Sequence, residues 1–463
     1  MSYFSIEFGL CFLPFFILYW CLCARPRVQN ALLLAASYGI LATFSLNFLY
    51  VLLGYTLVVC GLGHLSARWP GRWFVRGLIL AVVLGCFYAF KYQDLMASAV
   101  QAAGLPLQWP VLQLLLPVGL SFYVFHSVSY LVSINRGELK PVALPDLALY
   151  LAFFPSLIAG PVNRALDFMP QIRPTEVRQV LDPYRALGLI GLAAVKLFLL
   201  SSWLANEWVD PVFDTPSASS AEQILLAVYG YSLQIYFNFS GYTNLVTGIA
   251  LLLGFRLPEN FNYPYLAHNL KEFWARWHIS LSRFIRDYIY IPLGGNRHGL
   301  WPGMLYMMIA MLISGLWHGA SVNFIVWGAL HGVGLAIYKL WATWGPGESD
   351  KPVARLLARL LTFHYVALAW IFFRSATLDD AIELLKGLGG LSLQGLDSEA
   401  GISVMVCWVL LLLYPTWVRF MRELFAASQR IPAVLYPVML GLFISVVIFA
   451  SPAGVPGFIY ASF

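Results

Sequence analysis

The chain has 463 residues, of which 60% are hydrophobic and only 11% are charged. A soluble chain carries about 25% charged residues, so this composition excludes a soluble globular protein and predicts an integral membrane protein. The net charge of +6 has the sign expected of basic cytoplasmic loops and does not indicate nucleic-acid binding.

The N-terminal apolar run, "MSYFSIEFGLCFLPFFILYWCLCARPR", has no basic residue before it and has Arg25 and Arg27 after it. This order predicts a first membrane helix with its N-terminus outside, not a cleavable signal. The cysteines lie in or beside apolar runs without metal or redox spacing, so we expect small buried hydrophobic residues and no metal site. They are Cys11, Cys21, Cys23, Cys60, Cys86 and Cys407.

Long apolar runs recur after this first one and predict an all-α polytopic membrane protein. A helix needs about 20 apolar residues to cross a bilayer, and we expect roughly eleven to thirteen hydrophobic helical segments, some too short to span. The runs are unbroken, unlike the alternating strands of a membrane barrel. No internal repeat or long hydrophilic insertion interrupts them, so a single membrane domain over residues 1–463 is the simplest expectation.

The loops between the runs differ in charge. Arg-rich connections lie at 25–27, 68–76, 164–185, 256–297, 351–359 and 419–430. Connections nearly free of Lys and Arg lie at 93–110, 205–221 and 387–403. The positive-inside rule predicts that the first set is cytoplasmic and the second is outside. The assignment alternates along the chain provided that the stretch around 146–160 only dips into the membrane.

The longest polar stretch, residues 254–299, predicts an amphipathic helix at or just below the cytoplasmic surface. At about 100° per residue, one face is polar and the other is apolar. The polar face holds Arg276, Ser280, Arg283, Arg286 and Asp287, and the apolar face holds Trp274, Trp277, His278, Leu281, Ile285 and Tyr288. A plain interfacial anchor would show the same pattern, but it has no need to bury an imidazole, so His278 favours a functional role.

The apolar run "MLISGLWHGASVNFIVWGALHG" carries two further histidines, His318 and His331. Ionisable side chains at membrane depth are energetically costly and are therefore candidates for function. Glycines flank His318 and allow close approach of backbone and ligand, so we interpret it as functional. For His126, His331 and His364 the simpler interpretation is a buried neutral imidazole bonded to a backbone carbonyl or a hydroxyl.

A histidine at this depth suits a general base for acyl transfer better than other chemistry. The chain has no H-x-x-x-H or C-x-x-C spacing for a metal, no G-x-S-x-G elbow and no P-loop. A proton relay would recruit intramembrane acids, which the apolar runs lack. Two non-catalytic alternatives are a transporter, which should show two similar halves that we do not find, and a scaffold, in which His318 would be dispensable.

Five motifs occur in an order that resembles the membrane-bound O-acyltransferase (MBOAT) superfamily. They are "LLLPVGLSFYVFHSVSYLVSINRGEL", "YLAFFPSLIAGPVNRALDFMPQI", "YGYSLQIYFNFSGYTNLVTGIALLLGF", "NFNYPYLAHNLKEFWARWHISLSRFIRDYIYIPLGGNR" and "GLWHGASVNFIVWGALHG". The chain is most similar to the bacterial alginate O-acetyltransferase branch, which includes peptidoglycan and cellulose O-acetylation proteins and the D-alanyl exporter. The resemblance is strongest over residues 85–375.

The resemblance implies a ring of helices around a central tunnel, in which His318 is the base and His278 is the second motif position. It implies a protein of the bacterial inner membrane with no bound cofactor, which uses acetyl-CoA from the cytoplasm as donor. The acceptor would be an exported polysaccharide such as alginate, or alternatively cellulose or peptidoglycan, reached through a periplasmic acetyltransferase partner and the secretion machinery.

Further candidate site residues accompany the histidine pair. The guanidinium groups of Arg276, Arg283 and Arg286 match phosphate oxygens of the donor, although cytoplasmic anchoring is the simpler explanation for them. We expect Trp317, Asn238 and Tyr242 to line the tunnel.

The chain departs from the family pattern at several polar positions. Related proteins usually read Y-F-D-F-S-G-Y-S-D, whereas Asn238 and Asn244 replace both acids here. Ser133 stands where an Asp is common, and His126 stands where a Gln is common. The histidine pair is intact, so we expect these changes to affect the acceptor or partner and not the reaction.

Overall fold

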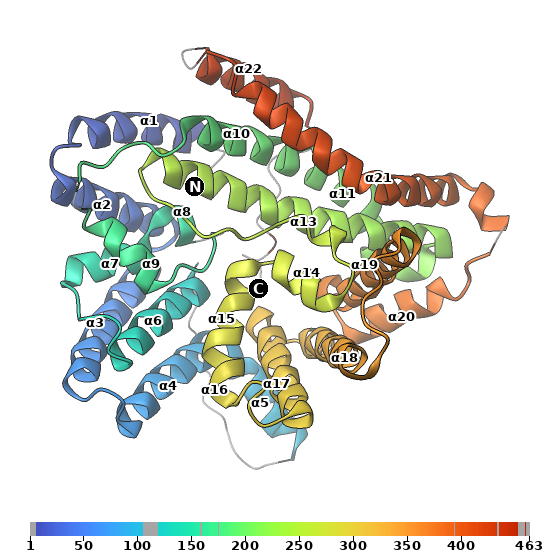
Figure 1. The fold of residues 1–463 in the computed structure, drawn as a ribbon, viewed down its shortest axis with the longest axis horizontal. Coiled ribbons are helices and arrows are strands. Elements are labelled where there is room, and N and C mark those ends of the chain that lie inside the picture. The colour runs from blue at the N-terminus through green and yellow to red at the C-terminus, as the bar shows by residue number, and fades with distance from the viewer. Residues whose placement is uncertain are drawn as a thin grey trace. The chain divides into compact units, whose positions relative to one another are not determined.

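The computed structural model of the chain describes residues 6–104, 119–157, 160–174, 176–392, 394–432, 435–451 and 459. Every regular element in these ranges is a helix, which confirms the predicted all-α class (Figure 1). The chain forms two compact units, Met1–Ala186 with Leu245–Pro258 and Leu187–Asn244 with Glu259–Phe463. The expectation of one membrane domain stays a prediction.

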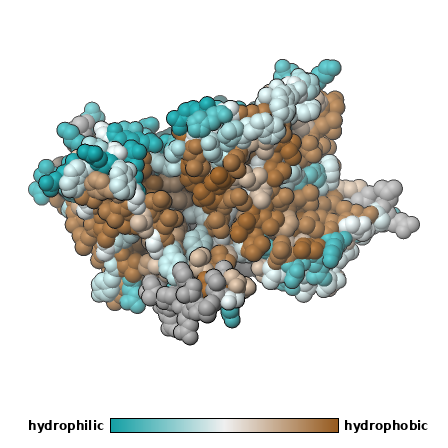
Figure 2. Space-filling view, turned by 90° about the horizontal axis from the view of Figure 1, so that it is seen from below, coloured by the Kyte–Doolittle hydropathy of each residue, from teal (hydrophilic) through white to brown (hydrophobic). Residues whose placement is uncertain are grey.

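Within the described ranges, seven helical segments are long and apolar enough to cross a membrane, so the chain is a multi-pass membrane protein. They are Leu46–Arg68, Trp73–Tyr92, Pro183–Asp214, Leu300–His318, Val322–Trp344, Pro352–Arg374 and Glu399–Ser428. Two shorter apolar helices are Glu7–Cys21 and Tyr436–Phe449. Figure 2 shows hydrophobic residues over broad areas of the drawn face, with hydrophilic residues at their margins.

The first unit consists of the N-terminal helices. They are α1 (Ile6–Cys21), α2 (Pro26–Phe44), α3 (Leu46–Arg68), α4 (Trp73–Phe87), η1 (Tyr88–Tyr92), α5 (Gln93–Ala102), α6 (Leu120–Asn135), α7 (Leu144–Ala152), α8 (Phe154–Leu157) and α9 (Ala165–Ile172). The helices α7 and α8 have 9 and 4 residues, too few to cross a bilayer, as the predicted dip at 146–160 requires.

The helices α10 (Pro183–Ala194) and α13 (Ala221–Leu252) carry residues of both units. The second unit adds the remaining elements. They are η2 (Val195–Ser201), α11 (Ser202–Leu204), η3 (Ala205–Val209), α12 (Asp210–Asp214), η4 (Pro216–Ala218), η5 (Pro264–Leu266), α14 (Leu270–Arg276), α15 (Ile279–Ile285), η6 (Arg286–Tyr290), α16 (Ile291–Leu293), α17 (Leu300–His318), α18 (Val322–Trp344), α19 (Pro352–Arg374), α20 (Leu378–Leu388), η7 (Gln394–Asp397), α21 (Glu399–Ser428) and α22 (Tyr436–Phe449).

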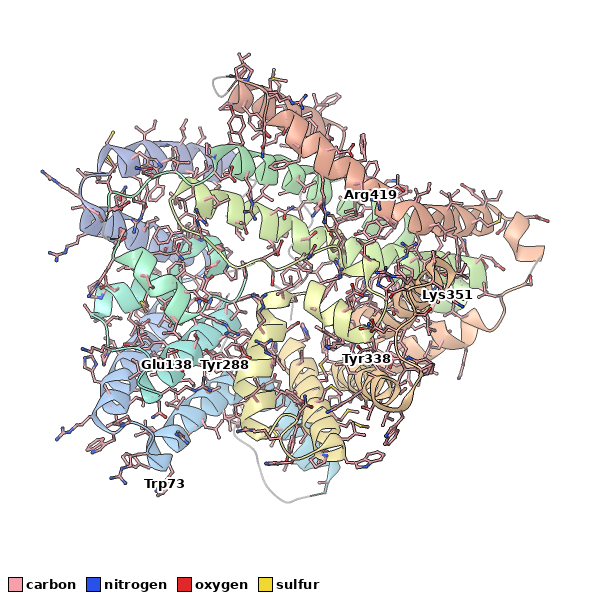
Figure 3. The ribbon with its side chains drawn as sticks, viewed as in Figure 1. Trp73, Glu138, Tyr288, Tyr338, Lys351 and Arg419 are labelled. Carbon is pink, nitrogen blue, oxygen red and sulfur yellow. The ribbon has the colours of Figure 1, made fainter. Side chains whose placement is uncertain are left out.

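A buried aromatic cluster forms the core of the second unit. The largest of its buried side chains are Trp277, Trp327 and Trp370, which come from the α14–α15 connection, α18 and α19. Figure 3 labels Tyr338, which lies towards the end of α18. Its hydroxyl donates a hydrogen bond to Glu348 in the loop before α19. The core therefore joins three segments that are far apart in sequence.

The prediction of a single amphipathic helix within 254–299 is wrong, because the helix is interrupted between α14 and α15. This interruption at residues 277–278 is called the break below. His278 has φ 41° and ψ 52°, a left-handed conformation that non-glycine residues seldom adopt. Ser280, expected on the polar face, is only 5% exposed. Asn260 stabilises the break by a bond to the residue that follows His278. The backbone carbonyl of Asn260 accepts a hydrogen bond from the Ile279 N–H at 3.0 Å. A tertiary contact thus overrides the helical period.

The expectation that all cysteines are buried is also wrong. Cys407 is buried, but Cys11 and Cys21 on α1 are exposed. Hydropathy does not separate a lipid-facing side of an apolar helix from its protein-facing side, because both sides are apolar in a membrane protein.

Candidate active site

The first part of the site is the tight hairpin of α17 and α18, which places His318 at the end of α17. A Cβ atom added at Gly315 would collide with the backbone carbonyl of Phe324, and one added at Gly319 would collide with the Phe324 ring. The glycines flanking His318 therefore allow the close approach of α18. The sequence predicted close approach of both backbone and ligand, and this contact confirms the part that concerns the backbone.

Aromatic rings enclose the imidazole of His318, which is 3% exposed. Ring centroids lie 4.6 Å away for Trp317, 5.0 Å for Trp327 and 4.9 Å for Phe373. The Trp327 and Phe373 contacts are edge-to-face, the geometry that aromatic quadrupoles favour. This enclosure excludes bulk water from the imidazole.

The second part is His278, which is 1% exposed and sits at the left-handed break before α15. Its Nδ1 lies 3.0 Å from Oδ1 of Asn260, and that same oxygen accepts from the backbone N–H of Ser280 at 3.3 Å. Because a backbone N–H can only donate, this atom of Asn260 is the carbonyl oxygen, so His278 Nδ1 carries the proton. In the neutral ring Nε2 is then the acceptor.

Burial holds His278 in its neutral form by lowering its pKa from 6.5 to about 3. The Phe239 ring meets it edge-on, with centroids 4.6 Å apart. A neutral imidazole with a defined tautomer is what a proton acceptor or an orienting group requires.

The structure brings the two histidines together on one indole ring. The Trp317 centroid lies 6.2 Å from that of His278 and 4.6 Å from that of His318. Trp317, expected to line a tunnel, is therefore in contact with both imidazoles. The tunnel itself stays a prediction.

The other two expected lining residues lie on α13, and both are buried. Asn238 Nδ2 donates to Ser201 Oγ at 3.5 Å, and Asn238 Oδ1 accepts from the Ile459 N–H at 3.1 Å. Tyr242 is 6% exposed. On the same helix, the Phe239 ring contacts the imidazole of His278. A role for Asn238 and Tyr242 in the tunnel stays a prediction.

Two of the three candidate arginines are paired within their own segment. Arg276 donates to Glu272 at 2.7 Å and to the Asn262 carbonyl at 3.1 Å, and Arg286 donates to Asp287 at 2.6 Å. Burial raises the pKa of Glu272, but hydrogen bonds from His268 and Arg276 outweigh it and hold the pKa below its usual range. Arg283 is exposed. Donor binding by these arginines stays a prediction.

The remaining apolar-run histidines differ in their partners. His126 is buried, and its Nε2 accepts from the Asn163 N–H at 3.1 Å. His364 is only partly buried, so its predicted burial is wrong, but it contacts the Leu360 carbonyl and the Tyr229 hydroxyl, each at 2.7 Å, as predicted. His331 is buried as predicted, but within the described ranges neither ring nitrogen has a hydrogen-bond partner, so the expected bond is wrong. Aromatic packing replaces it, with Trp327 4.8 Å away between centroids.

Sequence reasoning missed Asn260, Trp327 and Phe373. Asn260 lies 18 residues before His278 in a loop, a separation without helical or strand periodicity. The two aromatics belong to apolar spans in which any large side chain would look alike. Only their ring contacts with His318 identify Trp327 and Phe373 as part of the site.

Residues 106–346 match MBOAT, the membrane-bound O-acyltransferase family. Together with the relatives described next, this match shows that the chain belongs to that family. It is a membrane-bound O-acyltransferase, and the transporter and scaffold alternatives lose their support.

Three relatives illustrate the similarity. The chain is 37% identical to a probable alginate O-acetylase AlgI of Pseudomonas syringae pv. tomato, over 82% of this chain and 73% of the relative. It is 35% identical to a probable alginate O-acetylase AlgI of Azotobacter vinelandii, over 92% and 86%. It is also 35% identical to a peptidoglycan O-acetyltransferase of Helicobacter pylori, over 71% and 67%.

Proposed function

We propose that this enzyme transfers acetyl groups from acetyl-CoA on the cytoplasmic side of a bacterial inner membrane to hydroxyl groups of an exported polysaccharide such as alginate. The names of the relatives support acetyl as the group and a cell-surface polymer as the acceptor. The relative from Helicobacter pylori makes peptidoglycan the second candidate, and cellulose is a further alternative with the same chemistry.

The contact of both imidazoles with Trp317 is the observation that carries this proposal. In the reaction, His318 takes the proton of the attacking hydroxyl while the hydroxyl oxygen forms a bond to the thioester carbonyl carbon. The carbon–sulfur bond then breaks, and the departing thiolate of coenzyme A takes the proton back from the imidazolium. No cofactor is needed, because one base serves both proton transfers.

His278 acts beside this base as an orienting group. Its Nδ1–H is held by Asn260, so its Nε2 accepts a hydrogen bond from the attacking hydroxyl or shares its proton. The aromatic enclosure of His318 keeps water from competing for the acetyl group.

The acceptor polymer lies outside while acetyl-CoA is inside, so the acetyl group has to pass through the protein. A periplasmic acetyltransferase associated with the secretion machinery is the proposed partner that passes it to the polymer. The multi-pass fold with its buried histidine pair suits such a transfer across a membrane.

The test is deletion of the gene followed by measurement of acetate released by mild alkali from each purified polymer. We expect one polymer to lose its acetyl groups and the wild-type gene to restore them. The polymer that loses acetate identifies the acceptor among alginate-like exopolysaccharide, cellulose and peptidoglycan. If no polymer loses acetate, the proposal is wrong.

A further inference from the structure

The second unit contains a lysine inside a candidate membrane span that the proposed reaction does not use. Lys196 lies in the span Pro183–Asp214, within the π-helical run η2. Ionisable side chains at membrane depth are costly and usually serve a function, and π-helical turns occur frequently at functional sites. The position of Lys196 therefore indicates a functional role, such as binding of a ligand.

Among the residues that the structure describes, every contact of Lys196 is with an electrically neutral group. Its Nζ donates to Ser240 Oγ at 2.9 Å and lies 5.4 Å from the centroid of the Tyr236 ring. With the Asn244 amide oriented so that both of its atoms meet complementary partners, its oxygen accepts from Nζ at 3.2 Å. An ammonium group has three N–H donors, of which these two oxygens take two.

Lys196 is partly exposed, whereas Ser240 beneath it is 1% exposed. The protein partners of the ammonium are therefore held in the interior, while part of the lysine side chain remains uncovered. A charge at this depth without an opposite charge is costly, and an anion bound to it would offset part of that cost.

The contact residues of Lys196 on α13 are neighbours of residues that contact the His278 region. Ser240 directly follows Phe239, whose ring contacts His278. Tyr236, which underlies the ammonium, contacts Trp277 with centroids 6.3 Å apart. One helix, α13, therefore carries both the partners of Lys196 and a ring that packs against His278.

We propose that Lys196, Ser240 and Asn244 form a binding site for an anionic oxygen group, a carboxylate or a phosphate, of a ligand that enters the second unit. The ammonium supplies the charge and its third N–H, and Ser240 and Asn244 hold it in place. Two ligands of the proposed function carry such groups: coenzyme A has phosphates, and a uronic-acid polymer has carboxylates. The identity of the source rests on the proposed function, whereas the binding of an anion does not.

The alternative is that Lys196 is a neutral amine with a purely structural role. Asn244→Asp separates the two, because it places a carboxylate beside Nζ that competes with an external anion. Lys196→Met removes the charge and keeps an unbranched side chain. Lys386→Met, in the last turn of α20, is the matched control for the loss of one positive charge elsewhere.

The experiment measures the dissociation constants of coenzyme A and of a uronic-acid oligosaccharide by calorimetry, with the purified full-length protein in detergent. A neutral oligosaccharide of the same length is the reference ligand. We expect Lys196→Met and Asn244→Asp each to weaken binding of one anionic probe by at least about tenfold, the size expected for loss of a close charge pair. Lys386→Met should bind as the wild type does. The probe affected identifies the source.

Binding of both anionic probes within twofold of wild type in both variants, or no binding of either probe by the wild type, would overturn the site. Thermal melting of each variant checks folding, and Asn244→Asp keeps the test decisive if Lys196→Met does not fold. Acetate measurements on the gene deletion test the proposed function separately. Loss of acetate with normal binding by the variants would reject the anion site alone.

Discussion

The α17–α18 hairpin and the break between α14 and α15 each place a buried imidazole against Trp317, but they do so by different means. In the hairpin, the conformation follows from glycines within four residues of His318, which let two helices pack closely. At the break, Asn260 holds His278 from 18 residues away and forces a left-handed backbone. A site residue fixed by its neighbours in sequence can be recognised from a motif, whereas one fixed by a distant loop cannot.

The largest expected effect tests the hairpin side of the comparison. His318→Ala should lower acetylation by a factor of about 10² to 10⁴, because the general base is removed. The measurement is acetate released from the purified polymer, with membrane insertion checked by immunoblotting. His298→Ala, an exposed histidine, is the control. Normal acetylation by well-inserted His318→Ala would remove His318 from the mechanism.

The next effect tests the break. Asn260→Ala frees the His278 ring to rotate, so we expect kcat to fall by roughly tenfold to a hundredfold while KM stays near wild type, since misplacing a reacting group costs rate. Initial rates of acetyl transfer from labelled acetyl-CoA measure both constants. If both constants remain at wild-type values, Asn260 does not position His278 for the reaction.

A third change tests whether the hairpin depends on its glycines. Gly315→Ala places a methyl group against the Phe324 carbonyl, so the helices have to separate, at a cost of about 1–3 kcal/mol. We expect a lower melting temperature in detergent and reduced activity. Gly54→Ala on α3 is the control, because a Cβ there meets nothing within 4 Å. Equal melting temperatures of the two variants would contradict this account of the hairpin.

A smaller effect is expected from pH, and it concerns the break alone. The pKa of folded His278 is about 3, below its ordinary value of 6.5, so the unfolded chain takes up the proton first as the pH falls. The stability contributed by the neutral ring is complete above pH 6.5 and is lost as the pH falls towards 3. His278→Asn should therefore lose less thermal stability than wild type between about pH 7.5 and about pH 5. Parallel pH profiles would show that His278 is not held neutral.

The smallest expected effect leaves activity unchanged and places the regions relative to the membrane. Single cysteines at the exposed positions Ser217 and His298 suit this test, whereas Ser280 is buried and does not. In a background without the native cysteines, an impermeant thiol reagent should label position 217 in intact cells and position 298 only after permeabilisation. The reverse pattern would invert the predicted topology.

The sequence by itself determined the membrane class, the all-helical fold and the family, and it predicted the histidine pair. These follow from hydropathy and from motifs whose residues are neighbours, such as "GLWHG", because local composition decides whether a segment enters a bilayer. The tertiary structure alone decided where the polar stretch breaks, which nitrogen of His278 carries the proton, and that Lys196 meets only neutral partners in the described part of the chain. Each of these depends on a contact between segments far apart in the chain. Helical periodicity carries no information about such contacts, because it records only which residues of one helix share a face.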